Sequence, residues 1–195
     1  DRDVTGVQTC ALPISDPARL NELWQRADQT RQQNVGGEVH LRGLVELSNY
    51  CVRLCAYCGL RAGNQALQRY RMSDDEVLDC ARMAVGFGYG TLVMQSGEDP
   101  QLTAERVSGL VQRVKAETPL AVTLSLGEWS EEEYVAWRTA GADRYLIRFE
   151  TSNRELYDRI HPPHASRRVD RLEILATLRR LGYEAGDVRA ILLTH

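Results

Sequence analysis

Three cysteines in one short loop constrain this chain more strongly than any other feature of its sequence. Cys51, Cys55 and Cys58 have the spacing C-x3-C-x2-C and directly follow a strand-like segment. Each of three soft thiolates can bind one iron of a cubane [4Fe–4S] cluster, which leaves the fourth iron open to chelation by a small molecule. A zinc site is the alternative, but it needs a fourth protein ligand, usually from a second cysteine or histidine pair, and no such pair follows.

The number and clustering of the cysteines are typical of a protein in a reducing compartment. The total of five cysteines is odd and no basic-then-apolar secretory signal opens the chain, so metal binding is a better interpretation than a disulfide framework. Cys80 lies on the apolar stripe of an expected helix, where we expect a buried small hydrophobe. These features favour a cytoplasmic location.

Charge and composition argue against some classes of partner. The formal net charge is −3, which gives no electrostatic support to binding of nucleic acid or of an anionic membrane. Apolar runs are far shorter than the roughly 20 residues that cross a bilayer. Hydrophobic residues make up 43% and charged residues 26% of the chain, as in ordinary globular proteins. We therefore expect no nucleic-acid partner and no membrane partner.

The two ends of the chain differ from its middle. Val4–Ile14 resembles the translation of a common DNA-sequencing adapter, so residues 1–15 are expected to be a non-native, disordered leader, with a genuine flexible leader as the alternative. Residues 187–195 break off within a strand-like segment. We therefore expect residues 16–195 to form one partial α/β domain, truncated on its C-terminal side.

Strand and helix patterns alternate between these ends. Helices are expected at residues 16–33, 73–88, around 107–114, at 130–141 and at 169–181, and strands at 39–48, 91–94, 120–126, 144–149 and from 183 onward. Ser73 with Glu76, and Ser130 with Glu133, form capping boxes at two helix starts. This alternation predicts right-handed βαβ units and a parallel sheet. The sheet is either open and doubly wound or part of a (β/α) barrel, and both place a site at the carboxyl ends of the strands.

The sequence motifs around the cysteines resemble those of the radical S-adenosylmethionine (SAM) superfamily, and within it those of the HydE family of [FeFe]-hydrogenase maturases. The resemblance covers roughly residues 16–186. It rests on Arg42–Cys51, Cys58–Arg61 with Asn64, Tyr70–Ser73, Val93–Pro100, Thr123–Glu128, Gly141–Thr151, Leu156–Tyr157 with His161–Pro162, and Leu181–Glu184. Biotin synthase and methylornithine synthase share the scaffold. After Gly186 the sequence departs from the family pattern.

The resemblance implies a fold, two cofactors and a chemistry. The fold is a (β/α)8 TIM-type radical SAM barrel, of which residues 16–195 hold an opening helix and about five βα units. The cofactors are a [4Fe–4S] cluster on the three cysteines and SAM, whose amino and carboxylate groups occupy the open iron. In this family the reduced cluster passes an electron to the SAM sulfonium and cleaves it to a 5′-deoxyadenosyl radical.

The resemblance implies that two segments near the cysteines contact SAM. Tyr57 resembles the aromatic residue that packs near the SAM adenine, with simple loop packing as the alternative. The family's Gly-Gly-Glu motif, which receives the methionine end of SAM, is replaced here by Gln95, Ser96, Gly97 and Glu98. A glycine lets the backbone approach closely, and carbonyl or carboxylate oxygens can accept from an ammonium. A mere turn before the following proline is the alternative.

Further contacts are expected from strand three and from the helix after strand four. Thr123 and Ser125 share one strand face, where they can hydrogen-bond SAM or substrate. Arg171, or less closely Arg168, matches the family arginine that meets the SAM carboxylate. His161 precedes a proline in a loop, where a structural role fits better than metal ligation.

Strand four carries three charged residues on one face, Arg144, Arg148 and Glu150, because they are separated by even steps. Three charges would be costly in an apolar core, but a polar barrel cavity with an anionic ligand tolerates them. We expect Glu150 to contact SAM and the two arginines to line the substrate pocket, with solvated edge residues as the alternative. Tyr145 and Ile147, on the opposite face, should pack under the outer helices.

The combined prediction is a radical SAM enzyme of the HydE type, which helps to assemble the [FeFe]-hydrogenase active-site cluster. Its expected partners are a small-molecule or organometallic iron substrate, other hydrogenase maturation proteins, and an electron donor such as ferredoxin or flavodoxin. The nearest alternative is another small-molecule radical SAM enzyme, similar to methylornithine synthase or biotin synthase. A non-catalytic iron–sulfur or zinc protein is the alternative from another class.

Overall fold

The computed structural model describes residues 16–148, 150–151, 153–162 and 171–183. The expected leader at residues 1–15, Arg168 and all but the first residue of the expected fifth strand lie outside these ranges. The described residues fall into two units, one that ends at residue 40 and one that begins at residue 41, so each unit is described by itself.

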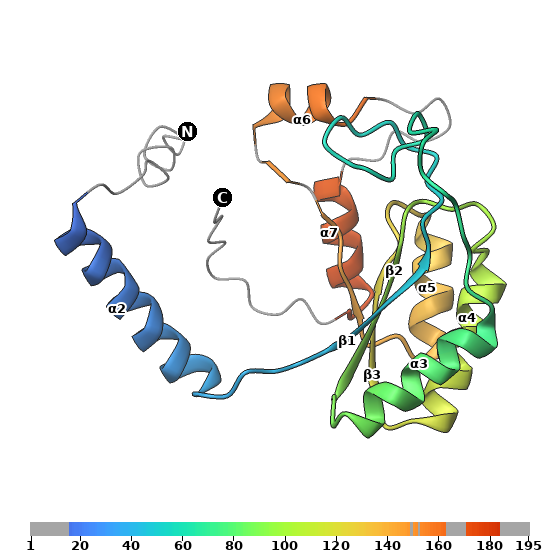
Figure 1. Cartoon of the computed structure of the whole chain (residues 1–195), viewed down its shortest axis with the longest axis horizontal. Coiled ribbons are helices and arrows are strands. Elements are labelled where there is room, and N and C mark those ends of the chain that lie inside the picture. The colour runs from blue at the N-terminus through green and yellow to red at the C-terminus, as the bar shows by residue number, and fades with distance from the viewer. Residues whose placement is uncertain (1–15, 149, 152, 163–170, 184–195) are drawn as a thin grey trace. The chain divides into compact units, whose positions relative to one another are not determined.

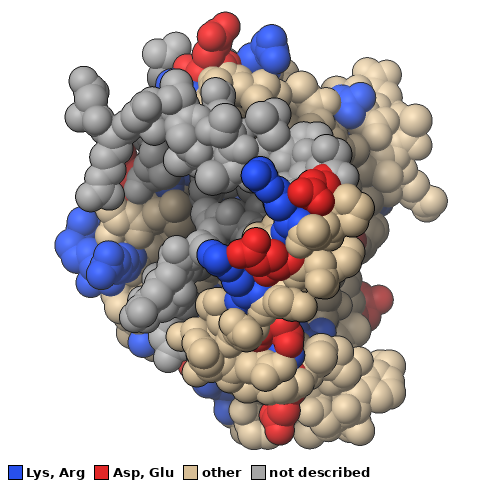
Figure 2. Space-filling view, turned by 90° about the vertical axis from the view of Figure 1, so that its left-hand side faces the viewer, with Lys and Arg blue, Asp and Glu red and all other residues tan. Residues whose placement is uncertain are grey.

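The first unit contributes one described element, helix α2 (Pro17–Val35), which confirms the expected opening helix. Asp16 caps the helix because its carboxylate accepts from the Ala18 amide at 3.0 Å. None of the side chains on α2 is buried. The helix surface carries the exposed ion pairs Arg26–Glu22 and Arg31–Asp28. Acidic and basic side chains also lie next to one another over the face of the molecule that Figure 2 shows.

The second unit is built on a parallel sheet of four described strands in the order β1-β2-β3-β4 (Figure 1). The strands are β1 (Gly43–Ser48), β2 (Thr91–Ser96), β3 (Ala121–Ser125) and β4 (Arg144–Tyr145). Consecutive strands are neighbours, and each pair is joined by a crossover that contains a helix. The predicted α/β class and the predicted parallel pairing are confirmed.

Two strands, β1 and β4, are at least four residues shorter than the sequence pattern predicts, whereas β2 and β3 differ from it by two residues each. The expected strand at residues 144–149 is wrong in length, because ladder pairing of β4 covers two residues, although the Leu146 amide still donates to the Leu124 carbonyl at 2.8 Å. Glu150 has a φ of +62°, in the left-handed region, which an extended strand does not contain. The first strand begins at Gly43 instead of residue 39.

Helices cover one face of the sheet. Helices α3 (Asp74–Gly86), α4 (Ala104–Glu117) and α5 (Glu131–Ala140) lie along that face in Figure 1, and α7 (Arg171–Arg180) follows β4 in the chain. Both predicted capping boxes are confirmed, since each cap serine accepts from the glutamate amide three residues on and each glutamate carboxylate accepts from the cap amide. None of the described helices is long and apolar enough to cross a membrane.

One short helix, α6 (Arg154–Ile160), does not follow from the sequence patterns, which place a loop there. Asn153 caps it by accepting from the Leu156 amide at 3.0 Å. The helix ends at His161, whose amide donates to the Tyr157 carbonyl. This helix brings the chain after β4 back toward the three cysteines, because the Ala56 amide donates to the Ile160 carbonyl at 2.9 Å.

The two faces of the sheet differ, as the period of two along a strand requires. The helix-covered face is apolar, and its buried strand side chains are Val45, Leu47, Leu92, Met94, Val122, Leu124 and Tyr145. Ile147 packs against this core as expected, and Cys80 does so while remaining half-buried. The opposite face is more polar and carries Glu46, Gln95, Thr123, Ser125 and Arg144. The sheet thus separates a dry core from a polar surface.

Asp99, just after β2, joins the ends of two strands. Its fully buried carboxylate accepts from the Ser48 hydroxyl at 2.5 Å and from Arg71 Nε at 2.6 Å. Burial alone would raise the pKa of the Asp99 carboxyl, but the bonds from Arg71 and Ser48 outweigh burial and hold that pKa below its usual value. The Arg71 guanidinium also lies 3.6 Å from the centre of the Tyr50 ring. This arrangement places the loop after β2 beside the start of the cysteine loop, defined here as residues 51–58.

Replacing Asp99 by Asn should lower the free energy of unfolding by about 1.5–3 kcal/mol at neutral pH, because charge-assisted hydrogen bonds are lost. The folded-state pKa is depressed, so the stabilisation is present above the unfolded pKa of about 3.9 and is lost as the pH falls through the folded pKa. Urea unfolding at neutral and at acidic pH measures this difference, with the exposed Asp79→Asn as the control. A deficit of the same size at both pH values would contradict the assignment.

Candidate metal centre and cofactor pocket

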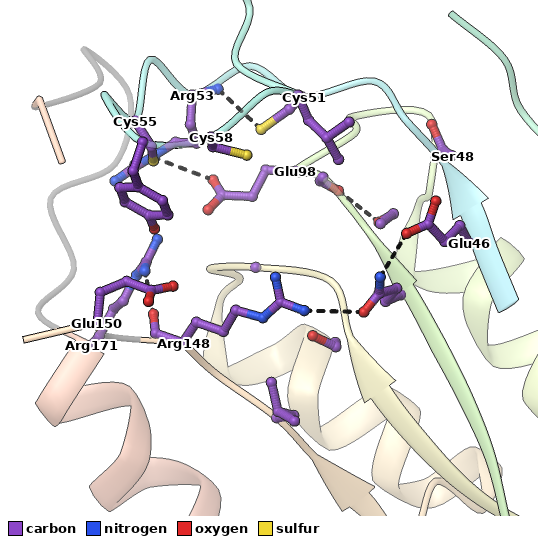
Figure 3. Close-up of a pocket in the computed structure, with 18 residues that line it drawn as sticks. Glu46, Ser48, Cys51, Arg53, Cys55, Cys58, Glu98, Arg148, Glu150 and Arg171 are labelled. Carbon is purple, nitrogen blue, oxygen red and sulfur yellow. Dashed lines mark hydrogen bonds and ion pairs between the residues drawn. The ribbon is translucent and has the colours of Figure 1, made fainter. Parts of the chain in front are cut away.

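A pocket lies at the carboxyl edge of the sheet, where the loops after the strands meet. Figure 3 shows the three cysteines on one side of it, with Glu98 beside them and the residues after β4 across from them. Its lining includes Glu46, Ser48, Cys51, Arg53, Cys55, Tyr57, Cys58, Gln95, Ser96, Gly97, Glu98, Ser125, Gly127, Arg148, Glu150 and Arg171. The structure therefore brings together most of the residues that the sequence singled out.

Two predicted site residues, Thr123 and Arg144, do not line the pocket. They pair in register on β3 and β4, two residues before Ser125 on β3, and so lie deeper along the polar face of the sheet. Thr123 is buried and Arg144 is half-buried.

The start of the cysteine loop is held by hydrogen bonds from two backbone amides. The Val52 amide donates to the Glu98 carbonyl at 3.0 Å, and the Arg53 amide donates to Cys51 Sγ at 3.4 Å. Cys55 is buried, whereas Cys51 and Cys58 are half-buried. Burial raises the pKa of the Cys51 and Cys55 thiols above the usual value, so iron must displace their protons when it binds.

The cysteines fit a cluster better than a single ion. In the described parts of the chain, no three His, Cys, Asp or Glu side chains are arranged to hold one metal ion. A cubane cluster does not need such a group, because each thiolate binds a different iron. Zinc does need it, since its ligands surround one ion at about 2.0–2.3 Å.

Gly97 allows the loop after β2 to lie directly against the cysteine loop. A Cβ on this residue would be 2.3 Å from the Tyr50 carbonyl oxygen and 2.5 Å from Cys51 Cβ. These distances are too short for any side chain, so glycine is required by the close approach of two backbones.

Glu98 is a buried carboxylate beneath the cysteines. Burial raises its pKa above the usual value, and the Arg53 guanidinium, with Nε 3.9 Å from Glu98 Oε2, partly opposes this effect. The Glu128 amide donates to Glu98 Oε1 at 3.2 Å. Gly127 makes room for the side chain, because its φ is +91° and a Cβ there would lie 2.2 Å from Glu98 Cγ.

Glu128, after β3, links the cysteine loop to α7. Its side chain is 1% exposed and accepts from Arg171 Nε at 2.6 Å and from Arg53 Nη2 at 3.3 Å. Burial disfavours the charged guanidinium of Arg171, but the Glu128 carboxylate outweighs burial and raises the Arg171 pKa. Sequence reasoning assigned no role to Arg53 or Glu128. The available signals were an arginine between two ligand cysteines and a glutamate at the end of a strand.

Two hydrogen bonds connect polar side chains that line the pocket. Gln95 Nε2 donates to Glu46 Oε1 at 2.8 Å, and Arg148 Nη2 donates to Gln95 Oε1 at 3.2 Å (Figure 3). Arg148 and Glu150 both line the pocket and are exposed, although they lie beyond the end of β4, so strand alternation does not account for their placement. Glu150 adopts its left-handed φ at the pocket edge, where functional residues often hold such conformations.

Buried polar atoms near the pocket that have no hydrogen-bond partner among the described residues include Arg53 Nε, Arg53 Nη1 and Thr123 Oγ1. A buried donor without a partner is costly. Together with three thiols, a close glycine and a buried carboxylate, these atoms fit a site that is completed by an iron–sulfur cluster and a polar ligand.

The family model of the radical SAM superfamily matches residues 45–194, which include the cysteine loop, the sheet and the pocket. The chain belongs to the radical SAM superfamily, whose members use a [4Fe–4S] cluster and SAM.

Within that superfamily, curated relatives are similar to this chain over most of its length. The [FeFe] hydrogenase maturase subunit HydE of Thermotoga maritima is 47% identical over 176 residues, which are 90% of this chain and 50% of that protein. The 3-methylornithine synthase of Methanosarcina acetivorans is 30% identical over 151 residues, which are 76% of this chain and 43% of that protein. The predicted likeness to HydE is confirmed. The chain spans about half the length of the curated relatives it matches.

Solved structures support the predicted fold. Methylornithine synthase (PylB) superposes with a TM-score of 0.80 at 26% identity, covering 88% of this chain and 51% of that chain. HydG, a maturase of the [FeFe]-hydrogenase, gives 0.76 at 24% identity, covering 88% and 39%, and this likeness concerns the fold alone. The four described strands and their helices are therefore part of a radical SAM TIM-type barrel.

Replacing Gly97 by Ala should displace the cysteine loop, because the new Cβ would collide with backbone that cannot yield cheaply. We expect a loss of about 1–3 kcal/mol in the free energy of unfolding and a lower iron content after anaerobic reconstitution. Gly109→Ala is the matched control, since a Cβ there meets nothing within 4 Å and alanine suits the interior of α4. Wild-type iron content in Gly97→Ala would refute the role given to this glycine.

Proposed function

We propose that the protein is a radical SAM enzyme of the HydE type, which acts in assembly of the [FeFe]-hydrogenase active-site cluster. The observation that carries this proposal is the position of Cys51, Cys55 and Cys58 on one pocket with Glu98 and Glu150, in a chain 47% identical to HydE. The bound [4Fe–4S] cluster and SAM would together supply an electron transfer and an adenosyl radical.

The end of β2 and the loop that follows it would bind the methionine end of SAM in this proposal. Gln95, Ser96, Gly97 and Glu98 all line the pocket next to the cysteine loop. Their carbonyl and carboxylate oxygens would accept from the SAM ammonium, and the tight approach at the glycine keeps them beside the cysteine loop. Glu150 adds a second carboxylate from the opposite side of the pocket.

Other pocket residues orient the remaining parts of SAM. The Tyr57 ring would pack on the adenine, and the Ser125 hydroxyl would donate to SAM or to the substrate. Thr123 lies deeper on the same face of β3 and lines the space below Ser125. Arg171 keeps a positive charge at the pocket because Glu128 holds its guanidinium, and this charge attracts the SAM carboxylate.

The substrate side of the pocket is formed by Arg148, with Arg144 deeper on the same face. Gln95 fixes the Arg148 guanidinium through a hydrogen bond of 3.2 Å. Guanidinium groups bind carboxylates and other anions with directed hydrogen bonds, so the two arginines suit an anionic, carboxylate-bearing substrate or an organometallic iron precursor.

The proposal also implies partners and a location. Reductive cleavage of SAM needs an electron donor such as ferredoxin or flavodoxin, and assembly of the hydrogenase active site needs the other hydrogenase maturation proteins. The cytoplasm is the proposed location, because its reducing conditions keep cysteine thiols available for iron.

A mutase of the methylornithine synthase type is the second candidate, favoured by the TM-score of 0.80 to PylB. The two candidates differ in substrate and not in the use of SAM. Incubating the reconstituted protein with reductant, SAM and a set of amino acids separates them, because formation of methylornithine would support the mutase and overturn the HydE-type assignment.

Alanine in place of any one of Cys51, Cys55 and Cys58 should abolish the visible absorbance of the reconstituted cluster and the reductive cleavage of SAM, because three thiolates leave no spare ligand. Cys80→Ala is the matched control, since Cys80 lies away from the pocket on α3. Iron and sulfide analysis measures the outcome. Unchanged iron content in all three variants would disprove the cluster assignment.

Glu150→Gln should weaken SAM binding by about 10- to 150-fold, which corresponds to the loss of about 1.5–3 kcal/mol for a charge-assisted hydrogen bond. Arg148→Ala should instead impair turnover of the substrate and leave cleavage of SAM without substrate largely intact. Calorimetric titration of SAM into the reconstituted variants, with product analysis, measures both effects. Wild-type SAM affinity in Glu150→Gln would mean that this carboxylate does not contact SAM.

A further inference from the structure

Two side chains that lie between the cysteines, those of Arg53 and Tyr57, contact a row of three buried side chains. The row consists of Glu128, Arg171 and His161. Arg53, between the first two cysteines, donates to Glu128 at 3.3 Å. Tyr57, between the last two, has its hydroxyl 2.9 Å from His161 Nε2. Arg171 joins these two contacts, because its Nε donates to Glu128 at 2.6 Å and its Nη1 lies 3.2 Å from His161 Nε2. The row therefore begins and ends in the cysteine loop.

The surroundings of His161 fix the direction of its hydrogen bonds. Its Nδ1 lies 3.1 Å from the Tyr157 carbonyl oxygen, which can only accept, so Nδ1 carries the proton. Nε2 is then an acceptor in the neutral ring, and it faces the Tyr57 hydroxyl and the Arg171 guanidinium, both of which can donate. The imidazole is buried, which favours this neutral form.

Glu128 is the charged centre of the row. It is 1% exposed and lies between two guanidinium groups that are each 7% exposed, so its removal would leave Arg53 and Arg171 buried with less compensation. The residues of the row come from three separate places in the chain, namely the loop after β3, the end of α6 and the start of α7.

We propose that Glu128, Arg171 and His161 are positioning residues that hold the cysteine loop by Arg53 and Tyr57, so that the loop is arranged before iron binds. This inference rests on the proposed function in one respect, the assignment of the three cysteines as cluster ligands. It adds that the geometry of the loop comes from the protein and does not wait for the metal.

Hydrogen exchange of the metal-free protein tests the proposal without any activity. The Ala56 amide, which donates to the Ile160 carbonyl, reports on the Tyr57–His161 end, and the Ala62 amide, which donates to the Arg53 carbonyl, reports on the Arg53 end. His161→Phe and Tyr57→Phe should speed exchange at Ala56 by about tenfold, equivalent to about 1.4 kcal/mol.

Glu128→Gln should speed exchange at both Ala56 and Ala62, because Glu128 holds Arg53 directly and His161 through Arg171. His161→Gln is the conservative variant, since its side-chain oxygen can accept from the Tyr57 hydroxyl, and it should restore slow exchange at Ala56. Glu117→Gln is the matched control: it also loses an arginine partner, Arg82, but lies away from the pocket, so neither amide should change.

Unchanged exchange at Ala56 in both His161→Phe and Tyr57→Phe would overturn the proposal, as would equal exchange in His161→Phe and His161→Gln. If Glu128→Gln does not fold, the two phenylalanine variants still decide the matter, because Tyr57→Phe removes one hydroxyl from a half-exposed ring.

Electron paramagnetic resonance of the reduced, reconstituted protein gives a second readout. His161→Phe should broaden or shift the cluster signal measured with SAM, and His161→Gln should resemble the wild type; an identical signal in all three proteins would count against the proposal. If the wild type binds no cluster at all, the proposed function fails, whereas the exchange results on the metal-free loop remain interpretable.

Discussion

The pocket depends on the ion pairs that the buried Glu128 carboxylate makes with the guanidinium groups of Arg53 and Arg171. Glu128 binds Arg171 and Arg53 with its side chain, and its amide donates to Glu98. Burial of one such charge alone would be costly, and in the structure each of these four charges is buried beside an opposite charge. Their contacts fix the cysteine loop, the loops after β2 and β3, and the start of α7 relative to one another. The site is therefore organised by ion pairs and hydrogen bonds between residues that are far apart in the sequence, and the sheet supports them.

The parallel sheet has two faces, which carry different tasks. Leu92, Met94 and Val122 on the helix-covered face are fully buried and give the sheet its stability. The other face presents Gln95 and Arg148, joined by a hydrogen bond, toward the pocket. Because parallel strands end at the same edge, residues from the loops after the strands converge there.

Features that depend on neighbouring residues could be predicted from the sequence, and features that depend on distant contacts could not. The cysteine spacing, the capping boxes and the order of strands are local patterns, and the structure contains them. The short helix α6 and the early end of β4 were missed, since a seven-residue helix has little periodicity and the left-handed φ of Glu150 has no sequence signal. Glu128 meets Arg171 and Arg53 across 43 and 75 residues, a distance that no local pattern spans.

Mössbauer spectroscopy of the protein reconstituted with isotopically labelled iron tests most directly whether Cys51, Cys55 and Cys58 leave one iron of a cubane cluster open to SAM. Three cysteine-bound irons and one open iron predict that adding SAM changes the spectrum of about one quarter of the iron and leaves the rest unchanged. A spectrum that does not respond to SAM, or one in which all the iron responds alike, would contradict this assignment.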